Sequence, residues 1–323
     1  MELLNIVDPP NRPMNTSFNP TQEPKLHKDL IFIDVDKTEQ IVVGSTNTSA
    51  TFWEGSVQVF KGFNNFIERS WTSYYNGNII NDGKILSKYK SVVIAENPFS
   101  LSVLNIGDEQ DGSPILKYSQ EHLEKIKSIN LWDKSPRILT CGEKYLSIWN
   151  INENNGLKKI HDYVGYHTAD ITSSCTQKCD ENLFASTGID RRLIIWDTRM
   201  NIGAHVLYTN EFCSLTAVSW NTDTPTTVAV GTEIGDIYFL DTRKPDEFIS
   251  VKSCFKNSVH KIVYNSTGDL AVCGNCREVQ VFNDKYEVIY KNSDHSKFVR
   301  GLSWAKGSLY SCGFDTKVYK HKI

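Results

Sequence analysis

The chain has 323 residues, of which 40% are hydrophobic and 11% aromatic, so it can bury a large core. Its formal net charge of -3 is close to neutral, which excludes a global electrostatic attraction to nucleic acid or to anionic membranes. No apolar run reaches roughly 18 residues, and the N-terminus lacks the pattern of a signal peptide. We therefore expect the eight cysteines to be reduced thiols, and the sequons at Asn15, Asn47 and Asn265 to be unmodified.

Residues 1–28 differ from the rest of the chain in their proline content. Five of the ten prolines lie in this segment. Proline cannot donate a hydrogen bond to a β-ladder, so the segment cannot pair along its whole length. We expect an extended strap over residues 1–28, followed by one domain over residues 29–323.

Short apolar strands separated by turn residues fill residues 29–323, without helical periodicity. One strand position recurs at intervals of 44, 45, 47, 44, 42 and 39 residues, which is the period of propeller blades. This position is occupied in turn by Phe60, Leu104, Trp149, Trp196, Leu240, Phe282 and His321. The sequence therefore predicts an all-β fold, a single seven-bladed WD-repeat β-propeller.

The predicted seventh blade lacks an outermost strand. Ile323 follows directly on its third strand. We expect a few residues of the strap, 1–28, to supply the missing strand, because pairing the two ends removes an open sheet edge and closes the ring.

The connection between the second and third strands of blade one is long. Ten residues, TNTSATFWEG, separate the strands expected at 40–45 and 56–60, whereas blade four has a tight turn there. This loop carries Phe52 and Trp53 near its tip. A Trp buried in a partner is a common interface hot spot. Alternatively, both rings fold back onto the edge of the blade, and the pattern alone leaves these two readings open.

Blade four carries the polar set that a buried Trp requires. Trp196 must place its indole N–H on an acceptor, and Ser186 can accept it. His167 can bond to Ser186, and Asp190 can fix the tautomer of His167. Leaving one of these bonds unmade would cost about 1–3 kcal/mol.

The other blades repeat this set incompletely. Blade seven has His295, Ser311 and Asp315 at matching spacings, with His321 in place of the Trp. Blade three keeps Trp149 but has Glu143 at the position of the turn Asp. We expect the remaining blades to rely on apolar packing.

The residues give no sign of a catalytic, metal or cofactor site. No G-x-S-x-G, H-E-x-x-H or Gly-rich phosphate loop is present, and the Ser, His and Asp of blade four are expected to face a buried Trp. A zinc ion needs four ligands within about 2.3 Å, but the two cysteine pairs lie two blades apart. These pairs are Cys175–Cys179 and Cys273–Cys276. We predict no catalytic residue, no metal and no cofactor.

Two stretches have unbalanced charge. Residues 285–323 hold eight Lys and Arg against three acids, and we expect them to be a solvated edge of blade seven. No aromatic stacking platform accompanies them, which disfavours a nucleic-acid site. Residues 107–124 hold five acids against Lys117, a composition expected of an exposed loop that could attract basic peptides.

Four stretches resemble the WD-repeat subunit family of the methylosome, the propellers that accompany the type II protein arginine methyltransferase. They are VVGSTNTSATFWEGSVQVFK (42–61), GIDRRLIIWDTR (188–199), GTEIGDIYFLDTRKP (231–245) and HSKFVRGLSW (295–304). The first stretch is the specific one, because its arrangement of Trp, Gly-Ser and Phe-Lys is not generic to WD repeats. The likeness is thin in blades two and three.

The resemblance implies a non-catalytic adaptor in the cytoplasm and nucleus. It implies that the propeller binds the N-terminal barrel domain of the methyltransferase in a hetero-oligomer, without direct contact to nucleic acid or membrane. It also implies that the propeller helps present Arg/Gly-rich tails of Sm proteins, and histone tails, for symmetric dimethylation by the partner. The partner anchor of the family corresponds to Trp53, with Phe52 and Glu54 beside it.

Other functions stay open at this point. One is a generic WD-repeat scaffold, such as a substrate receptor of a ubiquitin ligase or a histone-tail reader. Another is a propeller hydrolase. The protein that co-elutes from cell extract separates the first from the methyltransferase adaptor, and an assay with model esters and glycosides tests the second.

Overall fold

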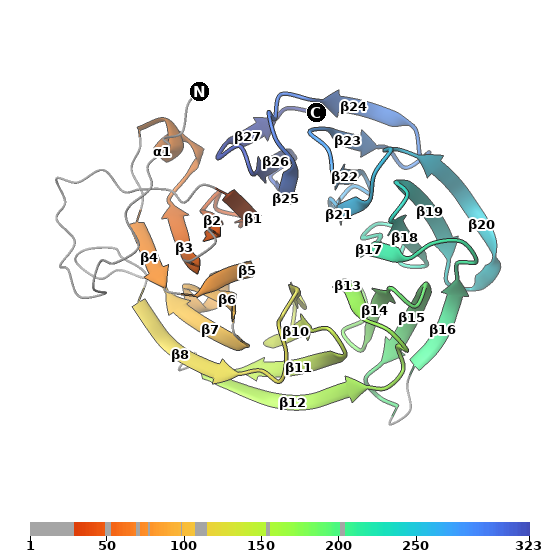
Figure 1. Ribbon diagram of the computed structural model, residues 1–323, viewed down its shortest axis with the longest axis horizontal. Helices are drawn as coiled ribbons and strands as arrows, with labels where there is room; N and C mark the ends of the chain where they lie inside the picture. The colour runs from red at the N-terminus through yellow and green to blue at the C-terminus, as the bar shows by residue number, and fades with distance from the viewer. Residues whose placement is uncertain are drawn as a thin grey trace.

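Figure 1 shows the computed structural model, which describes residues 29–48, 53–68, 72–76, 78–97, 99–106, 115–152, 156–200 and 204–323. These residues form seven sheets arranged as blades around a central axis. Within each sheet the strands follow one another in chain order, from an inner strand at the axis to an outer strand at the rim. The predicted all-β, seven-bladed propeller is confirmed.

The first four blades have four strands each. Blade one consists of β1 (Asp29–Val35), β2 (Ile41–Thr48), β3 (Trp53–Phe60) and β4 (Thr72–Asn76). Blade two consists of β5 (Ile79–Leu86), β6 (Ser91–Asn97), β7 (Ser100–Asn105) and β8 (Ile115–Glu121). Blade three consists of β9 (Ser128–Leu131), β10 (Arg137–Cys141), β11 (Tyr145–Ile151) and β12 (Leu157–Val164). Blade four consists of β13 (Ile171–Thr176), β14 (Leu183–Gly188), β15 (Arg192–Asp197) and β16 (Ala204–Thr209).

The last three blades complete the ring. Blade five consists of β17 (Leu215–Trp220), β18 (Thr227–Thr232), β19 (Asp236–Asp241) and β20 (Lys244–Ser253). Blade six consists of β21 (Val259–Tyr264), β22 (Leu270–Gly274), β23 (Val279–Phe282) and β24 (Val288–Asn292). Blade seven consists of β25 (Val299–Ala305), β26 (Ser308–Gly313) and β27 (Val318–His321). The described residues also form two helical segments, α1 (Phe63–Glu68) and η1 (Ser87–Tyr89). Neither is long and apolar enough to cross a membrane, and this holds for the whole described part of the chain.

The hydrophobic core is divided among the interfaces between adjacent blades. Seven clusters of buried side chains fill these interfaces, one for each neighbouring pair. Burial falls towards the rim: all six residues of β18 are buried, whereas β24 exposes three of its five. Second and third strands are covered by neighbouring blades on both faces, and β-branched and aromatic side chains therefore accumulate there.

Hydrogen bonds also join the inner strands of successive blades around the axis. Thr172 Oγ1 donates to the carbonyl of Leu215 in blade five at 2.7 Å. In blade two, Asp82 accepts a hydrogen bond from the backbone N–H of Ile129 in blade three at 2.8 Å. Contacts of this kind fix each blade relative to the next, in addition to the apolar packing.

Blades one and seven meet directly and close the ring within the described residues. The backbone N–H of Val35 donates to Ser303 Oγ at 3.1 Å. In the turn after β1, Glu39 accepts hydrogen bonds from Tyr310 at 3.0 Å and from Lys320 at 2.8 Å. Blade seven has three strands in this part of the chain. The predicted strap, 1–28, lies outside the described residues, so its role as the fourth strand stays a prediction.

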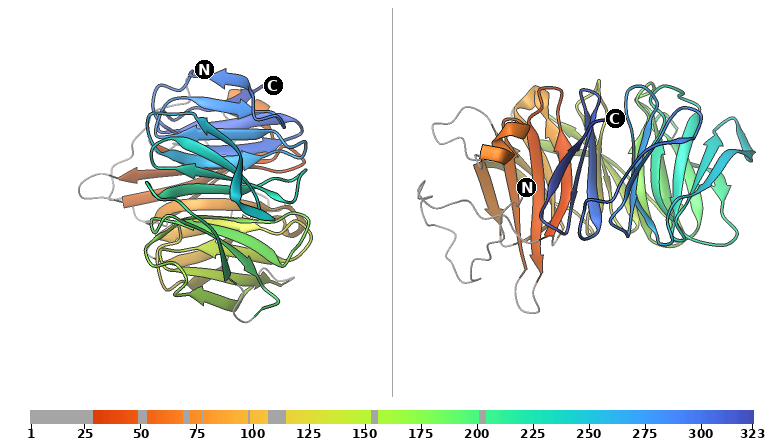
Figure 2. Two further views of the ribbon diagram at one scale, coloured as in Figure 1. Left: turned by 90° about the vertical axis from the view of Figure 1, so that its right-hand side faces the viewer. Right: turned by 90° about the horizontal axis from the view of Figure 1, so that it is seen from above.

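The long connection of blade one is a β-hairpin rather than the expected long loop. β2 continues to Thr48 and β3 begins at Trp53, and the register pairs these two residues. The two strands were expected to end at residue 45 and to begin at residue 56, so each was predicted three residues too short. Both strands extend past the neighbouring blades on one face of the propeller (Figure 2).

Candidate functional site

A chain of hydrogen bonds joins four side chains in blade four. The indole N–H of Trp196 donates to Ser186 Oγ at 2.8 Å. With a neutral imidazole, the Ser186 hydroxyl donates to His167 Nε2 at 2.7 Å, and His167 Nδ1–H donates to the carboxylate of Asp190 at 3.0 Å. Gly188 leaves room for this approach, because a Cβ there would lie 2.6 Å from Asp190 Oδ1. This chain of hydrogen bonds links the turn after β14 to the segment before β13.

This Ser–His–Asp set is closed to substrates. The side chains of His167 and Asp190 are 1% and 2% exposed, and Ser186 is fully buried. The Ser186 oxygen is also occupied by the indole N–H of Trp196. Burial lowers the pKa of His167, despite the opposing effect of its hydrogen bond to Asp190, so the ring is neutral at neutral pH. The set therefore satisfies a buried Trp and presents no nucleophile.

Blade seven repeats this chain of hydrogen bonds, with a different donor in the position of the Trp. His295 bonds to Asp315 at 2.9 Å and to Ser311 at 2.9 Å. His321 replaces the Trp, and its Nε2–H donates to Ser311 Oγ at 2.7 Å as an indole would. Tyr290 donates to His321 Nδ1 at 3.1 Å, which fixes this tautomer. Burial, followed by the neighbouring His295, lowers the pKa of His321 to about 4.

Blade three holds a third chain of hydrogen bonds, which was not predicted from the sequence. The indole N–H of Trp149 donates to Thr140 Oγ1 at 2.9 Å, and His122 Nε2 lies 3.2 Å from the same oxygen. Instead of a turn carboxylate, the backbone carbonyl of Glu124 accepts from His122 Nδ1 at 2.9 Å. For this blade only Trp149, with Glu143 at the turn position, was predicted, so Thr140 and His122 are additions to the predicted set. The usable signal was spacing, because His122 precedes Thr140 by 18 residues and His167 precedes Ser186 by 19.

Blade one has a polar network of another kind, located between β2 and β3. Ser45 Oγ lies 2.7 Å from Ser56 Oγ, and Gln58 Nε2 donates to Ser56 at 2.5 Å. All three side chains are buried. Gly55 allows blade two to approach, because a Cβ there would lie 2.5 Å from the carbonyl oxygen of Asn78. The base of the hairpin is therefore fixed by packing and by hydrogen bonds within the sheet.

Two of the predicted partner residues, Trp53 and Glu54, begin the strand β3 of this hairpin. Trp53 is the first residue of β3, while its side chain and the whole of Phe52 lie outside the described part of the structure. Glu54 is partly exposed and pairs with Asn47 across the ladder. The hydroxyl of Thr46 donates to the carbonyl of Glu54 at 3.1 Å, which adds a side-chain bond to the backbone ladder.

Comparison with known proteins gives relatives but no family model that matches. The chain is 22% identical to the methylosome protein WDR77 of Xenopus laevis over 305 residues, 88% of this chain and 86% of that protein. It is 29% identical to the protein NEDD1 of Bos taurus over 129 residues, 40% of this chain and 19% of that protein. It is 26% identical to the protein SOF1 of Saccharomyces cerevisiae over 159 residues, 49% of this chain and 30% of that protein.

The protein is a seven-bladed WD-repeat β-propeller. The sheets, the buried Trp chains and the relatives agree on this point. The predicted resemblance of this WD-repeat propeller to the WD-repeat subunit of the methylosome is confirmed, and it extends over most of both chains.

The cysteines of the propeller are separate buried or surface thiols. Cys175 lies on β13 of blade four and Cys273 on β22 of blade six, and burial raises the pKa of each to about 12. Such thiols stay protonated and are poor metal ligands. Throughout the described ranges, no three His, Cys, Asp or Glu side chains lie close enough to hold a metal ion.

Two lysines of the basic stretch form ion pairs, and only part of the acidic stretch is described. In the basic stretch, Lys320 pairs with Glu39 at 2.8 Å and Lys291 pairs with Glu278 at 2.9 Å. These pairs lie on different blades. In the acidic stretch, residues 107–114 lie outside the described part of the chain. The expected exposed loop is wrong for residues 115–122, because Ile115–Glu121 form strand β8 and His122 is buried.

Proposed function

We propose that this propeller is a non-catalytic adaptor for a type II protein arginine methyltransferase. The hairpin of β2 and β3 docks the enzyme, with Trp53 as the anchor and Phe52 and Glu54 beside it. The propeller then helps present Arg/Gly-rich substrates, such as Sm proteins and histone tails, for symmetric dimethylation by the partner. We propose the cytoplasm and the nucleus as its locations.

The geometry of the hairpin is the observation that carries this proposal. Its strands have eight residues each, and they extend past the face of the ring (Figure 2). Its base is held by the buried bonds of Ser45, Ser56 and Gln58. An anchor on a stiff support loses little conformational entropy on binding, so more of its contact energy appears as affinity.

Two further observations support an adaptor rather than an enzyme. The similarity to the methylosome protein WDR77 covers 88% of the chain. The Ser–His–Asp sets of blades four and seven are buried and satisfied by hydrogen bonds. All eight cysteines are unpaired, which fits a reducing compartment.

The proposal is tested by recovering partners of the tagged full chain from cell extract and identifying them by mass spectrometry. We expect the methyltransferase to be recovered with the unaltered chain and to be lost with Trp53→Ala. Phe212→Ala is the matched control, because this ring is 85% exposed but lies in a loop between blades four and five. Recovery of a ubiquitin-ligase subunit in place of the methyltransferase would contradict the proposal and favour the generic scaffold.

A further inference from the structure

A channel with a strongly basic lining runs along the axis of the propeller. Its volume is about 1260 Å³, and the inner strands of all seven blades contribute to its wall. The lining contains ten Lys and Arg residues but only four Asp and no Glu. The chain as a whole has a net charge of -3, so positive charge is concentrated here against the overall balance.

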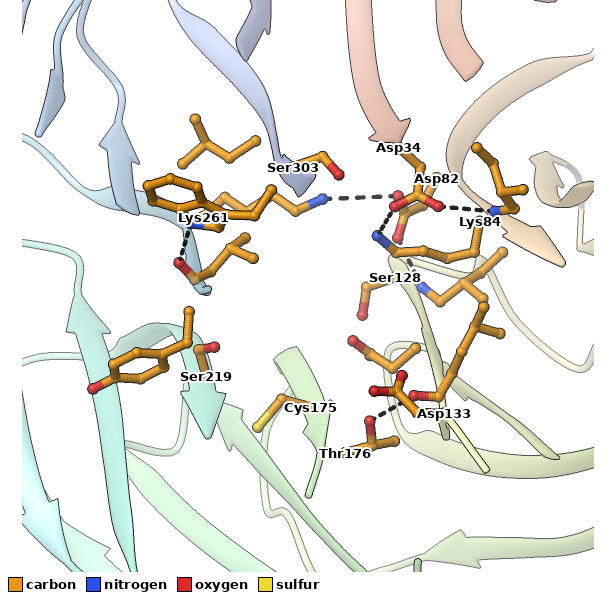
Figure 3. A pocket seen from close by; sticks show the side chains of 18 of the residues that line it. Asp34, Asp82, Lys84, Ser128, Asp133, Cys175, Thr176, Ser219, Lys261 and Ser303 are labelled. Carbon is orange, nitrogen blue, oxygen red and sulfur yellow. Dashed lines mark hydrogen bonds and ion pairs between the residues drawn. The ribbon is translucent and has the colours of Figure 1, made fainter. Parts of the chain in front are cut away.

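Two lysines deep in the channel are already paired with carboxylates. Lys84 Nζ lies 2.7 Å from Asp34, and Lys261 Nζ lies 3.9 Å from Asp82 (Figure 3). These pairs join neighbouring or facing inner strands, and Asp34 also accepts a hydrogen bond from the backbone N–H of Ile85 at 2.9 Å. The inner pairs stabilise the ring, so they are not the positive charge that is available to a ligand.

The available charge lies at one mouth of the channel, in the turns between the first and second strands. Five consecutive blades, from blade seven through blade four, each place one Lys of the channel lining there, and we call this set the basic crescent. It consists of Lys306, Lys37, Lys88, Lys134 and Lys178. The turns of blades five and six carry no Lys or Arg at this position.

Among the described residues, three members of the basic crescent have no carboxylate partner within ion-pair distance. Lys178 pairs with Asp133 at 2.6 Å, and Lys306 lies 3.7 Å from Glu39. In contrast, Lys37, Lys88 and Lys134 are exposed, and the described residues place no carboxylate within ion-pair distance of them. They belong to blades one, two and three and form an arc along one side of the mouth, beside Asp36, whose carboxylate accepts hydrogen bonds from Thr38 and Ser87.

We propose that the basic crescent binds an acidic peptide segment of a second partner protein. An extended run of Asp and Glu carboxylates is complementary in charge to an arc of separate, flexible ammonium groups. The crescent lies at the opposite end of the sheets from the β2–β3 hairpin, because the two sets of turns join opposite ends of the strands. The propeller can therefore hold this partner while the hairpin is occupied, which extends the proposed adaptor function.

The aromatic side chains beside the basic crescent favour a peptide over single-stranded nucleic acid. Nucleic-acid sites of this kind stack bases on exposed rings. Here Trp132 is only 3% exposed, and the guanidinium of Arg137 lies over it, 4.9 Å from the ring centre. Tyr89 packs against the core between blades two and three. Neither ring offers a free face to a base.

Fluorescence anisotropy with the full chain and a labelled oligoglutamate peptide tests this proposal. We expect saturable binding at about 50 mM salt that weakens strongly at about 200 mM, because exposed charge pairs are screened by salt. We expect the triple variant Lys37→Gln, Lys88→Gln, Lys134→Gln to bind about tenfold more weakly, as the loss of three exposed pairs predicts. The matched control removes three other exposed lysines, as Lys158→Gln, Lys256→Gln, Lys297→Gln, and keeps the affinity.

Each other outcome overturns the proposal. If the control triple loses as much affinity as the crescent triple, the binding is a general effect of net charge. If oligouridylate binds more tightly than oligoglutamate and loses affinity in the crescent triple, the site is for nucleic acid. If the oligoglutamate peptide does not bind at low salt, the crescent is not a site for acidic peptides. Circular dichroism of both triples establishes that they are folded.

Discussion

Blades four and one use their buried polar side chains in different ways. In blade four, Asp190 holds His167, so the turn after β14 is tied to the body of the ring. In blade one, Ser45 and Ser56 bond to each other across the ladder, and the strands beyond them continue outward as a hairpin. Hydrogen bonds that hold the turn of a blade against the ring stabilise the fold. A hairpin that extends beyond the ring instead offers a surface to a partner.

Truncation of the Trp in each of these two blades gives the largest expected contrast. Trp196 is 1% exposed and stacks on Phe184 with the ring centres 5.5 Å apart. Trp196→Ala should lower the free energy of unfolding by about 3–5 kcal/mol, as truncated core aromatics do. Trp53→Ala should leave it unchanged. Denaturant unfolding of both variants measures this, and equal losses would remove the distinction between the two blades.

The pH dependence of stability sharpens the comparison in blade seven. The pKa of His321 is about 4 in the folded protein, and it is near 6.5 when the chain is unfolded. The unfolded state binds a proton first as the pH falls, so the free energy of unfolding decreases between pH 6.5 and pH 4. This group alone contributes on the order of 3 kcal/mol to the decrease.

Thermal unfolding across that pH range, with His321→Gln as the comparison, measures the contribution. The variant should show a shallower decrease than the unaltered chain, with the remaining slope due in part to His167, whose pKa is also lowered. If stability changed with pH to the same extent in both proteins, His321 would not act as a neutral donor in the hydrogen-bond chain of blade seven.

A smaller effect is expected from the hydroxyl of Thr140 in blade three. Thr140→Val keeps the shape but leaves the indole N–H of Trp149 without its acceptor. This should cost about 1–3 kcal/mol of stability. Thr140→Ser keeps the oxygen and should cost less. Urea unfolding compares the two, and an equal loss in both would assign the effect to the methyl group.

The propeller and part of its polar chemistry were predictable because they depend on local repetition. A strand position that recurs every 39 to 47 residues gives seven blades, and the third strands found in the structure contain all seven predicted residues. The hydrogen-bonded set around Trp196 was predictable for a similar reason. The indole N–H needs an acceptor, and each following side chain can accept from or donate to the one before it. His321 could also be placed, because its ring nitrogen replaces an indole N–H.

The remaining features depend on partners that a single stretch of sequence does not specify. The chain of hydrogen bonds in blade three uses a Thr hydroxyl and the backbone carbonyl of Glu124. Every residue has a backbone carbonyl, so the sequence does not indicate which one accepts the bond. The hairpin is longer than expected because Thr46 and Thr48 continue a ladder whose length depends on the opposite strand. The basic crescent is dispersed over five blades, so it becomes visible only when the ring brings these turns together.

The affinity of the purified full chain for the purified methyltransferase, with and without Trp53→Ala, tests the central claim most directly. If the hairpin is the docking element, the substitution should weaken binding by about 2–4 kcal/mol, as truncated hot-spot aromatics do. The unfolding transition of the variant should match that of the unaltered chain. An unchanged affinity in the folded variant would contradict the account.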